Sequence, residues 1–159
     1  MTGEVKVRRG QRSDLDAVMA LERGVEEAPH WNEEDYGSAV REECAAVHRL
    51  LVIAEYAGEL VGFAVGKVID VGSDSTTELE SVVVQRRARR MGVGKALCEG
   101  VIAWGREEGA VDVELEVRSR NVPARAFYQN LGFIEVGVRK NYYSTPPDDA
   151  VLMNLRPGE

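Results

Sequence analysis

The sequence has little cysteine and no long hydrophobic run. Its two cysteines, Cys44 and Cys98, lie far apart and form no C-x-x-C pair. This spacing argues against a metal site or a disulfide framework, and we expect reduced thiols. No apolar stretch approaches the roughly 20 residues that span a bilayer, and residues 1–12 contain no signal-peptide core. We therefore expect a cytoplasmic protein that binds no metal and does not enter a membrane.

Basic residues are fewer than acidic ones. The chain has 20 Lys and Arg against 27 Asp and Glu, which gives a net charge of −7. General nucleic-acid binding requires a basic surface, so the overall charge argues against it while leaving a local basic patch open.

The length and composition indicate one domain over residues 1–159. One domain typically has about 100–200 residues. The hydrophobic content of 44% and the charged content of 30% are ordinary for a globular protein. A chain of this length is long enough to bury a real core.

The order of periodic segments predicts a mixed sheet flanked by helices, an α/β (α+β) fold. Strand patterns occupy residues 5–8, 50–56, 60–71, 76–84, 111–117, 133–138 and 151–155. Helical patterns predict one helix with Ser13 as its N-cap and a second that runs from Asn32 toward His48. Two further helices are predicted over residues 92–109 and 121–131, and a loop over residues 144–148.

Residues 85–95 form a basic, glycine-containing segment between a strand and a helix. The segment contains five basic residues and no acidic one. The first turn of a helix presents amides without internal partners, so an anion can bind there. Gly92 and Gly94 would let the backbone approach a phosphate, and arginines would add charge-assisted hydrogen bonds. The spacing fits neither a nucleotide P-loop nor G-x-G-x-x-G, and the alternative is a solvated basic loop.

Residues 89–94 read R-R-M-G-V-G and resemble the (R/Q)-x-x-G-x-(G/A) signature of the GNAT acetyltransferase superfamily. The predicted order of elements is also similar to the GNAT order over nearly the whole chain. The resemblance implies a GNAT fold with a mixed, mostly antiparallel sheet, and acetyl-coenzyme A as cosubstrate. It implies that the backbone of Val82 and Val84 flanks the thioester and pantetheine. The residues that it implies for the pyrophosphate are Arg89, Arg90, Met91, Gly92, Val93, Gly94 and Lys95.

Acetyl transfer to an amine has three chemical requirements. The amine must lose a proton before it attacks, the thioester oxygen needs a hydrogen-bond donor, and the departing thiolate benefits from a proton. A carboxylate can relay the first proton, and a phenol can deliver the last. A site for this reaction therefore needs both groups beside the thioester.

Residues 115–133 carry both groups. They contain L-E-V-R, Asn121, Ala124 and Y-Q-N-L-G-F, and they resemble the GNAT segment LEVRxxN…A…LYxxxGF, with Phe127 in place of the usual leucine. With R-K-N-Y-Y at 139–143 and D-A-V-L-M at 149–153, the chain resembles more narrowly the ribosomal-protein-alanine N-acetyltransferases. The roles implied by the resemblance are Glu116 as general base through water, Tyr128 as general acid to the sulfur, Asn121 as a coenzyme contact, and Tyr142 and Tyr143 as walls of an acceptor-peptide groove.

Each of these residues also has a plain structural interpretation. Glu116 alternates with apolar residues as any solvated strand position does, and Glu78, Glu80 or a water molecule are rival bases. The structural alternatives for the others are a core residue for Tyr128, a helix cap for Asn121, and strand aromatics for Tyr142 and Tyr143.

The sequence thus predicts an acetyl-coenzyme A-dependent N-acetyltransferase that acts on the N-terminal amine of a protein, such as a ribosomal protein. The subfamily usually has a Phe-Pro-Trp-like stretch where residues 28–31 read A-P-H-W, and Pro146 and Pro147 lie in the expected loop. Both departures concern the acceptor, so a polyamine or an antibiotic is an alternative substrate. A non-catalytic acyl-coenzyme A binding module and a nucleic-acid-binding domain that uses residues 86–90 also stay open. Either a monomer or a homodimer is compatible with the sequence.

Overall fold

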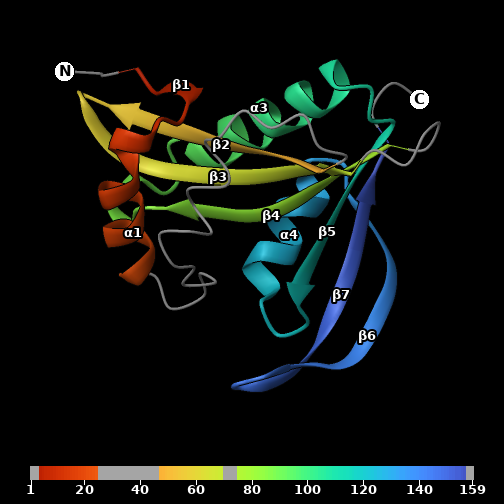
Figure 1. Ribbon diagram of the computed structural model, residues 1–159. Coiled ribbons are helices and arrows are strands. Elements are labelled where there is room, and N and C mark those ends of the chain that lie inside the picture. The colour runs from red at the N-terminus through yellow and green to blue at the C-terminus, as the bar shows by residue number, and fades with distance from the viewer. Residues whose placement is uncertain (1–3, 25–46, 70–74, 157–159) are drawn as a thin grey trace.

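The computed structural model describes residues 4–24, 47–69 and 75–156, which form one seven-stranded sheet with helices on both faces (Figure 1). The strands are β1 Lys6–Arg9, β2 Val47–Tyr56, β3 Glu59–Ile69, β4 Thr76–Val84, β5 Asp112–Arg118, β6 Ile134–Ser144 and β7 Pro147–Leu155. The α-helices are α1 Leu15–Arg23, α3 Val93–Glu107 and α4 Val122–Asn130, and single 3-10 turns lie at Arg12–Asp14 and Arg86–Ala88.

The sheet is mixed and mostly antiparallel, as predicted. Its order is β1-β2-β3-β4-β5-β7-β6, and within the described residues every neighbouring pair is antiparallel except β4 and β5. A parallel pair needs a long crossover connection, and α3 provides it. Two cores result: the larger lies between the sheet and helices α3 and α4, and the smaller lies beneath α1.

The predicted start of the first helix is wrong by one residue. Asp14, not Ser13, is the N-cap of α1, because Arg12–Asp14 already forms a 3-10 turn before the helix begins. The helix itself is present, and its apolar residues Leu15 and Val18 are buried against the sheet.

Two other predicted boundaries fail because strands are longer than their patterns suggest. The second helix, from Asn32, lies mostly outside the described residues, and its extension to His48 is wrong because β2 begins at Val47. The predicted loop over residues 144–148 is shorter than expected: β6 continues to Ser144 and β7 begins at Pro147, so only Thr145 and Pro146 form the turn. The cross-strand hydrogen bonds of a hairpin extend these strands past the apolar residues that signal them.

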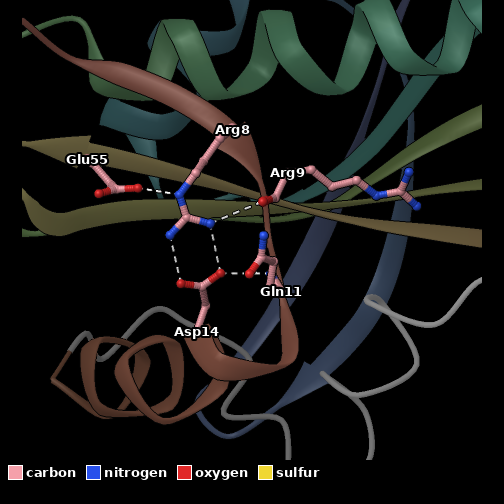
Figure 2. Close-up of polar contacts among 5 residues, drawn as sticks. All are labelled: Arg8, Arg9, Gln11, Asp14 and Glu55. Atoms are coloured by element: carbon pink, nitrogen blue, oxygen red, sulfur yellow. Dashed lines mark hydrogen bonds and ion pairs between the residues drawn. The ribbon is translucent and has the colours of Figure 1, made fainter.

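A network of polar contacts fixes the turn between β1 and α1 (Figure 2). The Arg8 guanidinium donates to both carboxylate oxygens of Asp14 at 2.8 and 2.9 Å, and its Nε also donates to Glu55. The Gln11 amide donates to the same Asp14 carboxylate at 2.7 Å. The hydrogen bond from Arg8 holds the pKa of Asp14 below its usual value. The start of α1 is therefore tied to β1 and β2.

Helix α3 packs against β3 and β4 without room for an added methyl group. A Cβ at Gly66 would lie 2.5 Å from the Val101 Cγ1, and one at Gly105 would lie 1.9 Å from the Thr77 Oγ1. Real Cβ atoms do not approach other atoms so closely, so both glycines are needed for this close packing. The position of α3 relative to β4 is therefore rigidly defined.

Strand β4 carries a β-bulge at Glu80, which has no opposite residue on β3. Leu79 belongs to the core beneath α3, whereas Val83, four residues later, belongs to the core beneath α1. Residues four apart on a regular strand share a face, so the bulge must exchange the two faces. As a result Val82 and Val84 pack toward α3.

Candidate functional site

Strands β4 and β5 separate after three paired residues. They pair only over residues 76–78 and 112–114, although β4 continues to Val84 and β5 to Arg118, and they run apart in Figure 1. The outer edge of β4 is paired with β3 and that of β5 with β7. The facing edges therefore lack a strand partner within the described sheet. An extended ligand can hydrogen-bond to such an edge as another strand would.

The backbone groups of Val82 and Val84 face this divergence. The Gln85 amide donates to the Val61 carbonyl of β3 at 2.8 Å. Hydrogen bonding alternates along an antiparallel ladder, so residues 81, 83 and 85 bond toward β3. The amides and carbonyls of Val82 and Val84 then point the other way, toward β5. The two residues implied for pantetheine contact are thus the ones whose backbone faces the β4–β5 divergence.

The beginning of α3 presents free amides at the carboxyl end of β4. The Ala96 amide makes a hydrogen bond of 3.0 Å to the Gly92 carbonyl, so the amides of Val93, Gly94 and Lys95 precede the hydrogen bonds of the helix. Gly92 has φ +77° and Arg90 has φ +69°. A left-handed residue directly before a right-handed helix turns successive amides toward one point, which suits an anion.

The arginines of this segment differ in their availability. Arg89 and Arg90 are exposed and form no ion pair with another described residue. Arg87, in contrast, is paired with Glu59 and donates to Gln85 at 3.0 Å. The structure therefore offers Arg89 and Arg90, beside the free amides, as cationic side chains for a phosphate.

Glycine is needed at the two positions of the motif for different structural reasons. Gly92 is needed for its left-handed backbone, and a Cβ there would meet nothing within 4 Å. A Cβ at Gly94 would lie 3.2 Å from the Phe127 ring of α4 and 3.7 Å from Val84. Gly94 therefore lets α3 pack against α4, which is a different reason from the close phosphate approach expected from the sequence.

Tyr128 lies among aromatic residues behind this segment. Its ring contacts Phe127 and Phe133 edge-to-face, with centroid distances of 5.1 and 5.7 Å. Burial, with a smaller effect of Cys98, raises the pKa of the Tyr128 phenol, and burial raises the pKa of Cys98 to about 12. Both groups are therefore protonated at neutral pH. The Tyr128 phenol can therefore act as a hydrogen-bond donor.

Glu116 lies on the face of β5 that is turned away from α3. Val113, Leu115 and Val117 are buried on the α3 side. Val111, which the predicted strand over residues 111–117 included, precedes β5 and is 51% exposed. Glu116 itself is only partly exposed. The acidic face of β5 therefore lies toward the side of the sheet on which α1 packs.

Two residues of β6 contact the Glu116 carboxylate. Arg139 Nη1 lies 3.5 Å from Glu116 Oε1. The Tyr142 hydroxyl donates a hydrogen bond to the carboxylate, which raises the pKa of Tyr142. The structure thus brings together Glu116 and Tyr142, which sequence reasoning placed in separate roles.

The rival carboxylates on β4 are engaged in ion pairs. Glu80 accepts from the Arg49 guanidinium at 2.9 and 3.4 Å, and its carboxylate is largely buried. Lys67 lies 3.4 Å from Glu78 and 4.0 Å from Glu80. These contacts favour a structural role for Glu80.

Asn121 is the N-cap of α4. Its Oδ1 accepts a hydrogen bond from the Ala124 amide at 3.3 Å, and Pro123 lies in the first turn. The capping role considered from the sequence is thus confirmed, while a coenzyme contact stays a prediction.

Sequence reasoning missed Arg118, the last residue of β5. Its guanidinium lies over the Tyr143 ring at 4.1 Å and reaches the turn between β6 and β7. The only sequence signal was its place at the end of L-E-V-R, which does not say what it contacts. Tyr142 and Tyr143 themselves lie side by side with their rings edge-to-face.

The described residues lack two further features. None of their helices is long and apolar enough to cross a membrane. In the same ranges, no group of three or more His, Cys, Asp or Glu side chains is arranged to hold a metal ion.

Comparison with known proteins identifies relatives over nearly the whole chain. Residues 16–133 match the model of the acetyltransferase (GNAT) family. The chain is 32% identical over 147 residues to the [ribosomal protein bS18]-alanine N-acetyltransferase of Escherichia coli K12, covering 91% of this chain and 93% of the relative. It is 31% identical over 162 residues to an N-alpha-acetyltransferase of Sulfurisphaera tokodaii, covering 94% and 92%.

A solved structure supports the same relation. The crystal structure of the ribosomal-protein-S18-alanine N-acetyltransferase from Escherichia coli superposes with a TM-score of 0.79 at 28% identity, covering 96% of this chain and 94% of that one. The similarity extends over both sides of the β4–β5 divergence.

Proposed function

Because this chain belongs to the GNAT acetyltransferase family and is an acetyl-coenzyme A-dependent N-acetyltransferase, we propose that its acceptor is the N-terminal α-amine of a protein, with a ribosomal protein as the first candidate. The names of two relatives support this acceptor, since one acts on an alanine of a ribosomal protein and the other is an N-alpha-acetyltransferase. A ribosomal substrate would locate the reaction in the cytoplasm.

The residues proposed for acetyl-coenzyme A fit its chemistry. The pyrophosphate would accept hydrogen bonds from the amides of Val93, Gly94 and Lys95, with Arg89 and Arg90 adding charge. The amide-like pantetheine arm would lie along the unpaired edge of β4, at Val82 and Val84. The observation that carries this assignment is the separation of β4 from β5 after three residues, because it frees this edge.

The proposed chemistry uses one group from each side of the divergence. Glu116 would accept the proton of the acceptor ammonium, through water, and the neutral amine would attack the thioester carbonyl. Tyr128 would donate its hydroxyl hydrogen to the departing sulfur. Since burial keeps this phenol protonated, it stabilises the thiolate as it forms.

The proposed acceptor groove lies beside Glu116. Tyr142 contacts the carboxylate and is 49% exposed, so its ring is available to an incoming peptide. Tyr143 packs against Tyr142 at a centroid distance of 5.0 Å. A pair of aromatic rings offers a large rigid contact surface, which suits a peptide better than a small polyamine.

We also propose that residues 1–159 form one domain. Strands from both ends of the chain, β1 and β7, belong to the same sheet, which supports a single folding unit.

The proposal is tested by acetylation assays read by mass spectrometry. Peptides with free N-termini, including one with the N-terminus of a ribosomal S18 protein, would be compared with polyamines and aminoglycoside antibiotics. We expect acetylation at the peptide α-amine, and reduced rates of acetylation in Glu116→Gln and Tyr128→Phe. Acetylation of small amines alone would contradict the proposed acceptor. Coenzyme binding without any turnover would support the non-catalytic alternative.

A further inference from the structure

The end of the β6–β7 hairpin, residues 140–149, extends beyond the rest of the sheet. We refer to these residues as the hairpin tip. The β5–β7 pairing ends at Arg118, and residues 140–142 lie opposite Asp149 alone, so they form a wide bulge. Asn141 lies in the left-handed region with φ +54°, and its amide donates to the Asp149 carboxylate at 2.8 Å. The tip thus has a defined shape but no further strand beside it in the described sheet.

The Arg118 guanidinium contacts the tip with both its flat face and its N–H groups. The group lies 4.1 Å from the centroid of the Tyr143 ring. It also donates to the Pro146 carbonyl at 2.8 Å and the Thr145 carbonyl at 3.2 Å. A planar guanidinium can stack on a ring and donate hydrogen bonds from its edge at the same time, whereas an ammonium cannot.

The two residues after Arg118 add backbone contacts to the same tip. The Ser119 amide donates to the Asp149 carbonyl at 2.9 Å, and the Arg120 amide donates to the Asp148 carboxylate at 3.1 Å. Residues 118–120 therefore join the carboxyl end of β5 to the hairpin. Among the described residues, Arg118 is the only one of these three that makes a side-chain hydrogen bond to the tip.

The contact at Tyr143 determines where Tyr142 lies. The two rings pack edge-to-face, and the Tyr142 ring lies 5.7 Å from the Arg139 guanidinium, which is paired with Glu116. Glu116 lies two residues before Arg118 on the same strand. We propose that Arg118 is a positioning residue, which fixes the hairpin tip so that Tyr142 and Glu116 form one preorganised wall for the acceptor. This inference rests on the proposed function, in which an acceptor peptide binds between these groups.

The test uses Arg118→Lys, which keeps the charge and loses the planar group. Two measurements are needed: hydrogen–deuterium exchange of residues 140–149, and steady-state kinetics with an N-terminal peptide and acetyl-coenzyme A. We expect faster exchange at the tip and a peptide KM raised about tenfold, which corresponds to about 1.4 kcal/mol. The KM for acetyl-coenzyme A and the kcat at saturating peptide should stay within about twofold. Arg118→Gln should change the same quantities in the same direction.

A matched control is Arg125→Lys. Arg125 donates to the Glu135 carboxylate at the beginning of β6, at 2.7 and 3.0 Å, and to the Ser119 carbonyl at 2.9 Å. The variant loses a comparable guanidinium contact at the other end of the hairpin. Its peptide KM should stay within about twofold of the wild-type value.

Three results would overturn the inference. Unchanged exchange at the tip in both Arg118 variants would show that Arg118 does not fix it. Faster exchange with an unchanged peptide KM would show that fixing the tip does not prepare the acceptor wall. A parallel loss in kcat and in both KM values would indicate general damage instead of positioning. A wild-type enzyme that acetylates only small amines would contradict the proposed acceptor, and the exchange data would still decide whether Arg118 fixes the tip.

Discussion

The two sides of the β4–β5 divergence are held in place by different means. On the coenzyme side, β4, α3 and α4 pack so closely that glycines are required at the contacts, and the proposed ligand groups are mostly backbone amides. On the acceptor side, strand β6 is largely exposed, and side chains such as Arg118, Tyr142 and Arg139 hold the β6–β7 hairpin. Backbone geometry tolerates many side-chain changes, whereas a position fixed by a few side chains changes when one of them changes.

This difference suits the two substrates. Acetyl-coenzyme A is a single cosubstrate, and a rigid backbone site suits a ligand that does not vary. Acceptors differ, and a hairpin fixed by a few exchangeable side chains can be altered without disturbing the core. We therefore expect variants on the two sides to affect different kinetic constants.

The largest effect is expected for Tyr128→Phe on the coenzyme side. Removing the hydroxyl leaves the sulfur without its donor, so kcat should fall about 100-fold, within the usual range for acid–base groups. The ring still packs against Phe127 and Phe133, so coenzyme affinity should change little. Stopped-flow kinetics and coenzyme titration measure the two quantities. Equal losses in rate and affinity would contradict a role in the transition state.

A smaller effect, about tenfold on kcat/KM at neutral pH, is expected for Glu116→Gln on the acceptor side. The amide is similar in shape but cannot accept the ammonium proton, so the loss should grow as the pH falls and the amine is more fully protonated. A pH profile of kcat/KM from pH 6 to 9 measures this. A profile with the wild-type shape would transfer the role of base to Glu80 or to water.

Gly94→Ala is expected to lower the free energy of unfolding by about 1 kcal/mol, because the added methyl group would meet the Phe127 ring. In the Phe127→Leu background this cost should disappear, and chemical denaturation of the four proteins measures the coupling. Gly92→Ala is the matched control: its cost comes from a positive φ, so Phe127→Leu should not relieve it. Additivity of Gly94→Ala and Phe127→Leu within about 0.3–0.5 kcal/mol would contradict the assigned packing role.

The smallest effect is expected away from both sides, at Asp14 (Figure 2). Its folded-state pKa is lowered by Arg8, so its contribution is fully present above the unfolded value, near pH 4, and is lost as the pH falls through the folded value. Asp14→Asn should cost about 0.5–1 kcal/mol at pH 7 and progressively less at lower pH. Urea denaturation at several pH values measures this. A constant difference down to pH 2 would contradict it.

The sequence predicted the local structure around residues 85–95 better than the contacts between residues far apart in the chain. Residues 85–95 carry their chemistry locally, because a strand, a glycine-containing turn and a helix start are all short-range patterns. The β4 bulge at Glu80 left no such pattern, since only the pairing with β3 reveals it. The contacts of Arg118 join residues 27 and 28 positions apart, and no local signal indicates them. The features that the sequence did not predict depend on the pairing register of strands and on contacts between distant residues, and not on the local preference for helix or strand.

The parallel pairing of β4 and β5 covers only three residues on each strand. Strands β1 to β4 and strands β5 to β7 are therefore two parts of the sheet that are joined by few hydrogen bonds. An extended cosubstrate lying on β4 would supply hydrogen bonds where the protein itself has none, and would act as a temporary strand. Binding of the cosubstrate would then stabilise the folded protein, and the unfolding temperature would rise with the logarithm of the cosubstrate concentration. In each catalytic cycle the sheet would gain this additional strand when acetyl-coenzyme A binds and lose it when coenzyme A is released.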